Sequence, residues 1–199
     1  MKSTFFLSIA AAALMPLAAM SQVAPESQSG PPAPPAPVLK YEVMAGYAYS
    51  SLNQVNQSRH GLQGVQVVVS RDWGRHFAIT AVGDEYKWAT GAGNPGKPVI
   101  DSFLIGPEFR ANLYGPVDGF FRGLMGGEHT GGENMTPNVS FSGGVGGGIE
   151  WRMGRHLALR ISGDRIGGSF SLANNSSTLS YSPHRTWNPR GAIGMAYRF

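Results

Sequence analysis

The sequence contains no cysteine, so neither disulfide bonds nor thiolate metal sites can stabilise its fold. Charged residues are also scarce: they make up 14% of the 199 residues, against roughly a quarter in soluble domains. The 16 lysines and arginines form neither a block nor a stripe, although the net charge is +4. A nucleic-acid-binding surface clusters its basic residues, so we expect no nucleic-acid partner.

No apolar run long enough for a transmembrane helix follows position 39. An earlier apolar stretch, residues 5–17, follows the basic Lys2 and precedes a small-x-small site at residues 19–21, which is typical of a cleaved export signal. The stretch is shorter than the roughly 20 residues that a membrane-spanning helix needs. We therefore predict a signal peptide over residues 1–21 and export by the Sec pathway.

Residues 22–39 are rich in proline, serine, glutamine and alanine, with five prolines between positions 31 and 37. Such a composition prefers an extended polyproline conformation and has little apolar surface to bury. We predict a disordered, proline-rich periplasmic linker here, and a docking segment for a cell-wall partner is the alternative. Residues 40–199 form the third predicted segment.

From Lys40 onward apolar and polar residues alternate with a period of two, which predicts strands rather than helices. The first such segment places Tyr41, Val43, Ala45, Tyr47 and Tyr49 on one face. Seven further alternating segments follow, around residues 64–71, 75–81, 103–110, 120–125, 139–151, 157–164 and 192–199.

The connections between these segments are alternately short and long. Short turns are predicted at residues 72–74, 114–116 and 152–154, and a faint repeat relates residues 73–79 to 153–159 across two of them. Longer polar loops are predicted at residues 50–60, 89–98, 128–138 and 167–187. Short turns at one end and long loops at the other are typical of outer-membrane barrels. We therefore predict an all-β, eight-stranded antiparallel up-and-down transmembrane β-barrel with both ends in the periplasm.

The alternation does not say which face is inside, because a soluble barrel encloses its apolar face whereas a membrane barrel turns it towards lipid. Glycine, alanine and serine share the face that carries the charges, which suits a narrow barrel interior. Aromatic residues collect near both strand ends, as two membrane-interface belts require. The predicted belts are Tyr41, Trp73, Tyr114, Trp151, Tyr197 and Phe199 at the short-turn end and Tyr47, Tyr49, Tyr86, Trp88, Phe103 and Phe141 at the long-loop end.

The last strand carries a family resemblance. Residues 188–199 place Ile193, Met195, Tyr197 and Phe199 on one face and end on an aromatic residue. This segment resembles the closing strand of small outer-membrane barrels of the outer-membrane protein A-like transmembrane domain type. In that family the terminal aromatic pattern implies recognition by the barrel-assembly machinery. The resemblance covers residues 40–199 in pattern, is motif-like only in the last strand, and brings no catalytic residue with it.

Charged residues of both signs occupy the face predicted to line the interior. Unpaired charges are very unfavourable in a low-dielectric lumen, so we predict paired, hydrogen-bonded networks that plug the barrel. An ion or proton path is the alternative. The bases are Arg110, Arg122, Arg152, Arg160, Arg190 and Arg198, and the acids are Glu42, Asp84, Glu108, Asp118, Glu150 and Asp164.

Few residues suggest chemistry, and we expect no cofactor. A loop-built metal site could combine histidines with nearby glutamates, but no ligand spacing such as HExxH is present. Ser182 and His184 are the nearest candidates for a lipid A deacylase or acyltransferase, yet the His-x-Ser arrangement of such enzymes is missing. The metal-site candidates are His60, His129, His184, Glu128 and Glu133.

The sequence thus favours a non-catalytic, monomeric outer-membrane scaffold with a role in envelope integrity or surface interaction. Its expected partners are outer-membrane lipid, lipopolysaccharide and the barrel-assembly machinery. Two alternatives stay open at this point: an enzyme that modifies lipid A, and a soluble periplasmic barrel that holds a ligand.

Overall fold

The structure, a computed structural model, describes residues 39–53, 59–90, 99–131, 137–169 and 185–199. The predicted signal peptide and all but the last residue of the predicted linker lie outside these ranges, so both stay predictions. Within the described ranges, no helix is long and apolar enough to cross a membrane.

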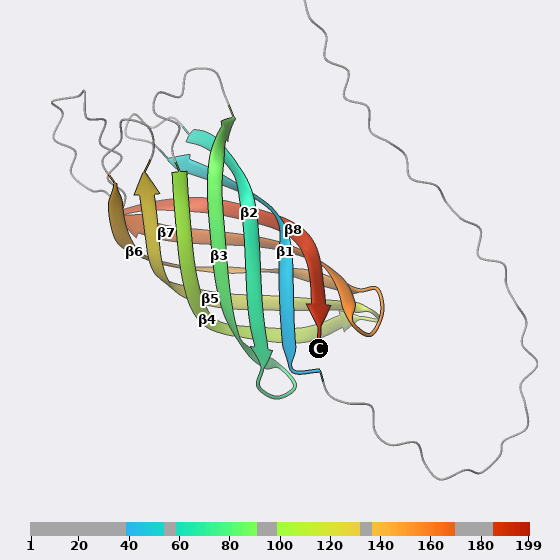
Figure 1. The fold of residues 1–199 in the computed structure, drawn as a ribbon. Helices are drawn as coiled ribbons and strands as arrows, with labels where there is room; N and C mark the ends of the chain where they lie inside the picture. The colour runs from blue at the N-terminus through green and yellow to red at the C-terminus, as the bar shows by residue number, and fades with distance from the viewer. Residues whose placement is uncertain (1–38, 54–58, 91–98, 132–136, 170–184) are drawn as a thin grey trace, which may run out of the picture. The chain divides into compact units, whose positions relative to one another are not determined.

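Eight antiparallel strands form one closed barrel (Figure 1). Each strand pairs with its neighbours in chain order, and the first closes against the last. The predicted eight-stranded up-and-down barrel is therefore confirmed. The strands are β1 (Tyr41–Asn53), β2 (Arg59–Asp72), β3 (Phe77–Thr90), β4 (Val99–Tyr114), β5 (Val117–Gly131), β6 (Asn138–Arg152), β7 (Leu157–Ser169) and β8 (Arg185–Arg198).

Several strands are longer than the polarity of the sequence indicated. The expected loops at 50–60, 89–98, 128–138 and 167–187 begin too early or end too late, because strand pairing continues into them. Glu128, for example, pairs with Ser102 of β4 and Ser140 of β6. A polar residue that faces the interior is compatible with a strand, so polarity alone is a poor sign of a loop in a barrel. The third strand, conversely, begins at Phe77 rather than at Arg75.

Two of the three short turns contain a glycine with positive φ, Gly74 at 96° and Gly115 at 51°. Other residues rarely adopt this left-handed conformation, so glycine suits these tight connections. At the same end of the barrel, the carbonyl of Phe199 accepts hydrogen bonds from the amides of Lys40 and Tyr41, at 3.1 and 3.0 Å. The beginning of β1 and the end of β8 therefore lie side by side at the short-turn end (Figure 1).

Many bulky apolar side chains face outward, and the buried arginines and carboxylates face inward. Phe103 is 62% exposed and Phe141 is 71% exposed, whereas the Arg122 and Arg160 side chains are fully buried. A soluble barrel has the opposite arrangement, so the alternative of a soluble ligand-binding barrel is incompatible with this structure.

The outward apolar band is nearly as tall as the apolar band of outer-membrane barrels. On β1 it runs from Tyr41 to Tyr49, both of which are exposed. Eight residue steps of about 3.3 Å, tilted by about 40°, span about 20 Å, close to the band of about 25 Å in outer-membrane barrels.

Candidate functional site

A cluster of charges fills the interior near the short-turn end, and Glu42 of β1 lies at its centre. Arg110 of β4 donates two hydrogen bonds of 3.1 Å to the two carboxylate oxygens of Glu42. Arg160 of β7 donates to the same carboxylate at 2.7 Å, and Arg198 of β8 at 2.8 Å. One glutamate on β1 thus binds an arginine of its neighbour β8 and, across the lumen, arginines of β4 and β7.

Two further glutamates balance the charge of these arginines. Glu108 accepts from the Nε atom of Arg110 at 2.6 Å and from Arg160 at 2.5 Å. Glu150 accepts from Arg198 and lies 3.6 Å from Arg160. We call these three glutamates and three arginines the Glu42 cluster, in which each formal charge has an opposite charge in contact. Its members are Glu42, Glu108, Glu150, Arg110, Arg160 and Arg198.

A duplicated turn supports this cluster from outside. At the end of the β2–β3 turn, Nδ1 of His76 lies 3.1 Å from the backbone oxygen of Arg110. At the end of the β6–β7 turn, Nδ1 of His156 lies 2.8 Å from the backbone oxygen of Arg198. Each imidazole also stacks on the aromatic residue that precedes its arginine. The repeat seen in the sequence therefore positions two arginines that both bind Glu42.

A buried ion pair lies in the lumen beyond the Glu42 cluster. Arg122 of β5 donates to both carboxylate oxygens of Asp164 on β7, at 2.9 and 2.6 Å. The ring of Phe120 lies 5.8 Å from the Arg122 guanidinium carbon and 3.8 Å from that of Arg160. The aromatic ring thus makes cation–π contacts with the arginine of this pair and with one arginine of the Glu42 cluster.

A second buried cluster is organised by Arg190 of β8. Its guanidinium donates to Asp84 at 3.2 Å, to Ser102 at 2.9 Å and to Glu128. Asp84 also accepts from Gln66 at 2.8 Å and from Ser102 at 3.0 Å. This network joins β2, β3, β4, β5 and β8.

Sequence reasoning placed Glu128 in a loop and so missed its part in this network. The alternation of β5 contained the necessary signal. Phe120, Arg122 and Leu124 face inward, and the same parity continues through Gly126 to Glu128. Gln66 also faces inward and belongs to the same network through its hydrogen bond to Asp84.

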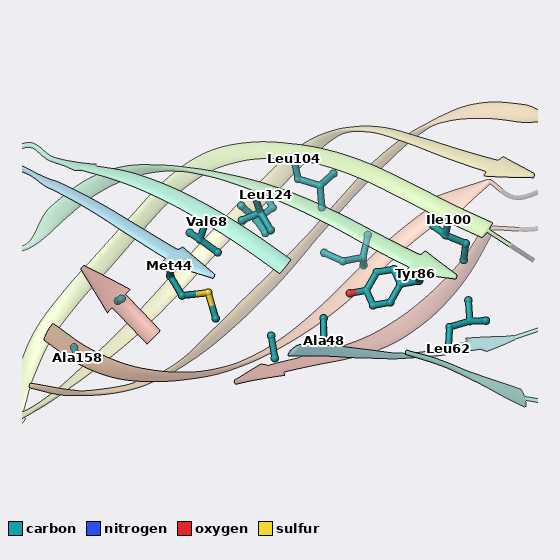
Figure 2. Packing of buried hydrophobic residues seen from close by; sticks show 13 residues of the cluster. Met44, Ala48, Leu62, Val68, Tyr86, Ile100, Leu104, Leu124 and Ala158 are labelled. Carbon is teal, nitrogen blue, oxygen red and sulfur yellow. The ribbon is translucent and has the colours of Figure 1, made fainter. Parts of the chain in front are cut away.

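The expectation that mainly small and charged residues line the lumen is wrong for much of its length. Large apolar side chains pack inside the barrel, as Figure 2 shows for Met44, Leu104 and Leu124. The reason is volume, because the charged side chains do not fill all levels of an eight-stranded lumen. The larger members of this interior apolar layer are Met44, Leu62, Val68, Val82, Tyr86, Ile100, Leu104, Leu124 and Ile166.

Tyr86 is a further correction, since it was expected in the outer aromatic belt. Its side chain is fully buried inside the barrel (Figure 2), with the Arg190 guanidinium carbon 5.4 Å from the ring centroid. Along β3 the residues with odd numbers face outward from Phe77 to Glu85, so Tyr86 must face inward. The prediction was wrong because it considered only that Tyr86 lies near a strand end and not which way its side chain faces. The side chain of Trp88 lies outside the described part of the structure.

Arg152 and Asp118, both expected inside the lumen, lie instead at its mouth at the short-turn end. The Arg152 side chain is 40% exposed, and its Nε lies 3.1 Å from Asp118. They line a polar hollow of about 300 Å³ together with Asp72 and Asn112. These two charged residues therefore lie at the end of the barrel and do not fill its interior.

The structure separates the residues considered for a metal site. Glu128 faces the lumen, whereas His129 is exposed on the outer face and pairs with Asp101 at 3.5 Å. In the described ranges no group of three or more histidine, aspartate or glutamate residues is arranged to hold a metal ion. Glu133, His184, Ser182 and the side chain of His60 lie outside those ranges.

Solved structures with similar backbones include bacterial outer-membrane barrels. Neisserial surface protein A matches with a TM-score of 0.61 at 10% identity, over 80% of this chain and 97% of that chain. The N-terminal β-barrel domain of Pseudomonas aeruginosa OprF matches with a TM-score of 0.52 at 8% identity, over 81% and 98%. This chain has the fold of the small outer-membrane barrels.

Ail, the attachment invasion locus protein of Yersinia pestis, is a third similar structure, with a TM-score of 0.50 at 15% identity over 81% of this chain and 99% of that chain. The sequence itself matches no family model and no curated protein. At these identities the likeness concerns the fold, and the arrangement of side chains must be judged from this chain alone.

Proposed function

We propose that this chain is exported to the bacterial outer membrane, where it serves as a non-catalytic barrel with a structural or surface-interaction role. The observation that carries the proposal is the combination of an apolar outer face with a filled, internally paired interior. The outer face suits acyl chains, and the interior charges bind one another across the lumen. In this role the long-loop end faces the cell surface and the proline-rich segment lies in the periplasm.

The filled interior favours a scaffold over a channel. Arg122 and Arg160 are buried and bound to carboxylates, and Leu104 and Leu124 pack farther along the lumen. Ions would have to displace these paired side chains to pass. Eight-stranded barrels generally have interiors just wide enough to be filled by side chains.

The outward face of β8 supports recognition by the barrel-assembly machinery. Ile193, Met195, Tyr197 and Phe199 are all exposed there. β8 also pairs with β1 and so closes the barrel. Among the described strands, no edge is left with unpaired backbone groups that would need a second chain, which is consistent with a monomer.

Membrane fractionation and gel mobility test this proposal. We expect the protein in the outer-membrane fraction, with a gel mobility that changes on boiling because the closed barrel resists detergent until heated. A mobility that boiling does not alter, or recovery in the soluble fraction, would contradict an outer-membrane barrel.

A paired substitution tests the assembly role. Y197A/F199A should reduce the heat-modifiable fraction several-fold in cells. The control W151A removes a similarly exposed aromatic from β6 and should assemble normally. Equal assembly of both variants would argue against recognition through β8.

A further inference from the structure

Arg165 is an unusual residue on the outer face of the barrel. It is exposed on β7, where its paired neighbours are Val145 of β6 and Pro189 of β8. Its position is four residues before the end of β7 at Ser169, near the long loops. A cation therefore projects from the apolar face at the level where that face approaches the cell-surface side.

The neighbouring Trp187 of β8 lies beside this cation. Gly167 of β7 pairs with Trp187, and the indole ring lies over the glycine so closely that an added Cβ atom would be 3.1 Å from it. The guanidinium carbon of Arg165 lies 5.7 Å from the indole centroid. The contact is a cation–π interaction on the outer surface.

Arg165 has no carboxylate partner within the described ranges. The interior arginines differ in this respect, since Arg122 binds Asp164 and Arg190 binds Asp84. Two acids also face outward on β3 and β4, but Glu85 pairs with Lys87 and Asp101 lies near His129. Within the described ranges, the charge on Arg165 is thus not matched by any carboxylate.

We propose that Arg165 and Trp187 bind the phosphate of a phosphorylated glycolipid of the lipid A type in the outer leaflet. The proposal rests on the outer-membrane function proposed above. A guanidinium on a lipid-facing strand is unfavourable unless it reaches the headgroup region, and its planar fork of N–H donors matches a phosphate. The indole, with an apolar ring and one N–H donor, suits the same interface.

A matched pair of residues at the opposite rim provides a control. Arg71 of β2 is also exposed, and its guanidinium carbon lies 5.7 Å from the ring of Tyr41. This pair has the same chemistry but lies at the short-turn end, where only lipids of the periplasmic leaflet can reach it. Binding of outer-leaflet glycolipid to the barrel should therefore depend on Arg165 and not on Arg71.

The test uses the full chain, extracted in mild detergent from native outer membranes, with co-purifying lipid A quantified by native mass spectrometry. We expect the wild type and R71Q to retain equal lipid A, and R165Q to retain about tenfold less. R165K, which keeps the charge but loses the fork, should lie between them. Equal retention by R165Q and the wild type overturns the proposal.

A second arm adds defined lipids to the delipidated protein. R165Q should weaken binding of bisphosphorylated lipid A about tenfold and leave binding of dephosphorylated lipid A unchanged. An equal loss for phosphatidylglycerol would overturn the assignment to a glycolipid. Gel mobility of each variant shows whether the barrel has assembled. If the barrels assemble but bind lipid A independently of Arg165, only the lipid A site is contradicted. If the wild type is absent from the outer membrane, both the lipid A site and the outer-membrane function are contradicted.

Discussion

At the scale of single residues, the interior contacts depend on the geometry of the barrel more than on neighbours in the sequence. Glu42 binds Arg110 and Arg160, which are 68 and 118 positions away. Alternation indicated which charged residues share a face, but the partner of each depends on strand tilt and stagger. These are properties of the closed sheet, so the sequence could suggest a network without specifying its pairs.

The Arg122–Asp164 pair allows a direct test of buried-charge energetics. R122M alone leaves Asp164 charged and unpaired in the lumen, so the free energy of unfolding should fall by about 3–5 kcal/mol. The double variant R122M/D164L removes both charges and should recover most of that loss. Urea titration of the folded barrel in lipid vesicles measures both values, and additive losses in the double variant would contradict a paired buried charge.

Glu42 should be the most sensitive carboxylate in its cluster. E42Q leaves three arginines with one fewer opposite charge, and we expect a loss of at least about 3 kcal/mol in the same unfolding experiment. E85Q makes the matched change on the outer face and should leave the free energy of unfolding nearly unchanged. Similar losses for the two variants would show that Glu42 does not organise the cluster.

At the scale of strands, the period-two pattern located all eight elements but misplaced many of their ends. Strand cores such as residues 41–49 alternate clearly because one side meets lipid. Near the end of β5, however, residues on both faces are polar, and the contrast that marks a strand disappears. The inward face of β5 shows the result, since Glu128 was assigned to a loop although its parity matches Arg122.

Glycines within the strands differ in how closely another strand approaches them. A Cβ atom on Gly144 of β6 would lie 2.2 Å from the backbone oxygen of Arg165, whereas one on Gly127 of β5 would meet nothing within 4 Å. G144A should therefore destabilise the barrel by about 1–3 kcal/mol. G127A should be neutral or stabilise it by up to about 1 kcal/mol, because alanine restricts the unfolded chain. Unfolding of both variants in vesicles checks this, and a neutral G144A would contradict the close approach.

At the scale of the whole molecule, the direction of the two faces decides what kind of barrel this is. The sequence favoured lipid outside because small residues accompany the charges and aromatics cluster at strand ends. The orientation is as predicted, yet the interior contains an apolar layer that the first argument did not foresee. Tyr86 shows why, since an aromatic near a strand end belongs to the outer belt only if its parity is also outward.

The filled lumen makes a prediction about conductance. Reconstituted into planar bilayers, the protein should give no stable single-channel steps of the size produced by open porins, because paired charges and apolar side chains occupy the interior. A porin of known conductance in the same membranes provides the positive control. Regular, long-lived steps from this protein would contradict a closed interior.

The Glu42 cluster has a mechanical consequence. Arg110 of β4 and Arg160 of β7 extend to the Glu42 carboxylate on β1 and so connect strands that do not pair, whereas Arg198 lies on the neighbouring strand β8. A hollow sheet of this size could flatten into an ellipse under the lateral pressure of the surrounding lipid. Contacts between strands that do not pair oppose that distortion.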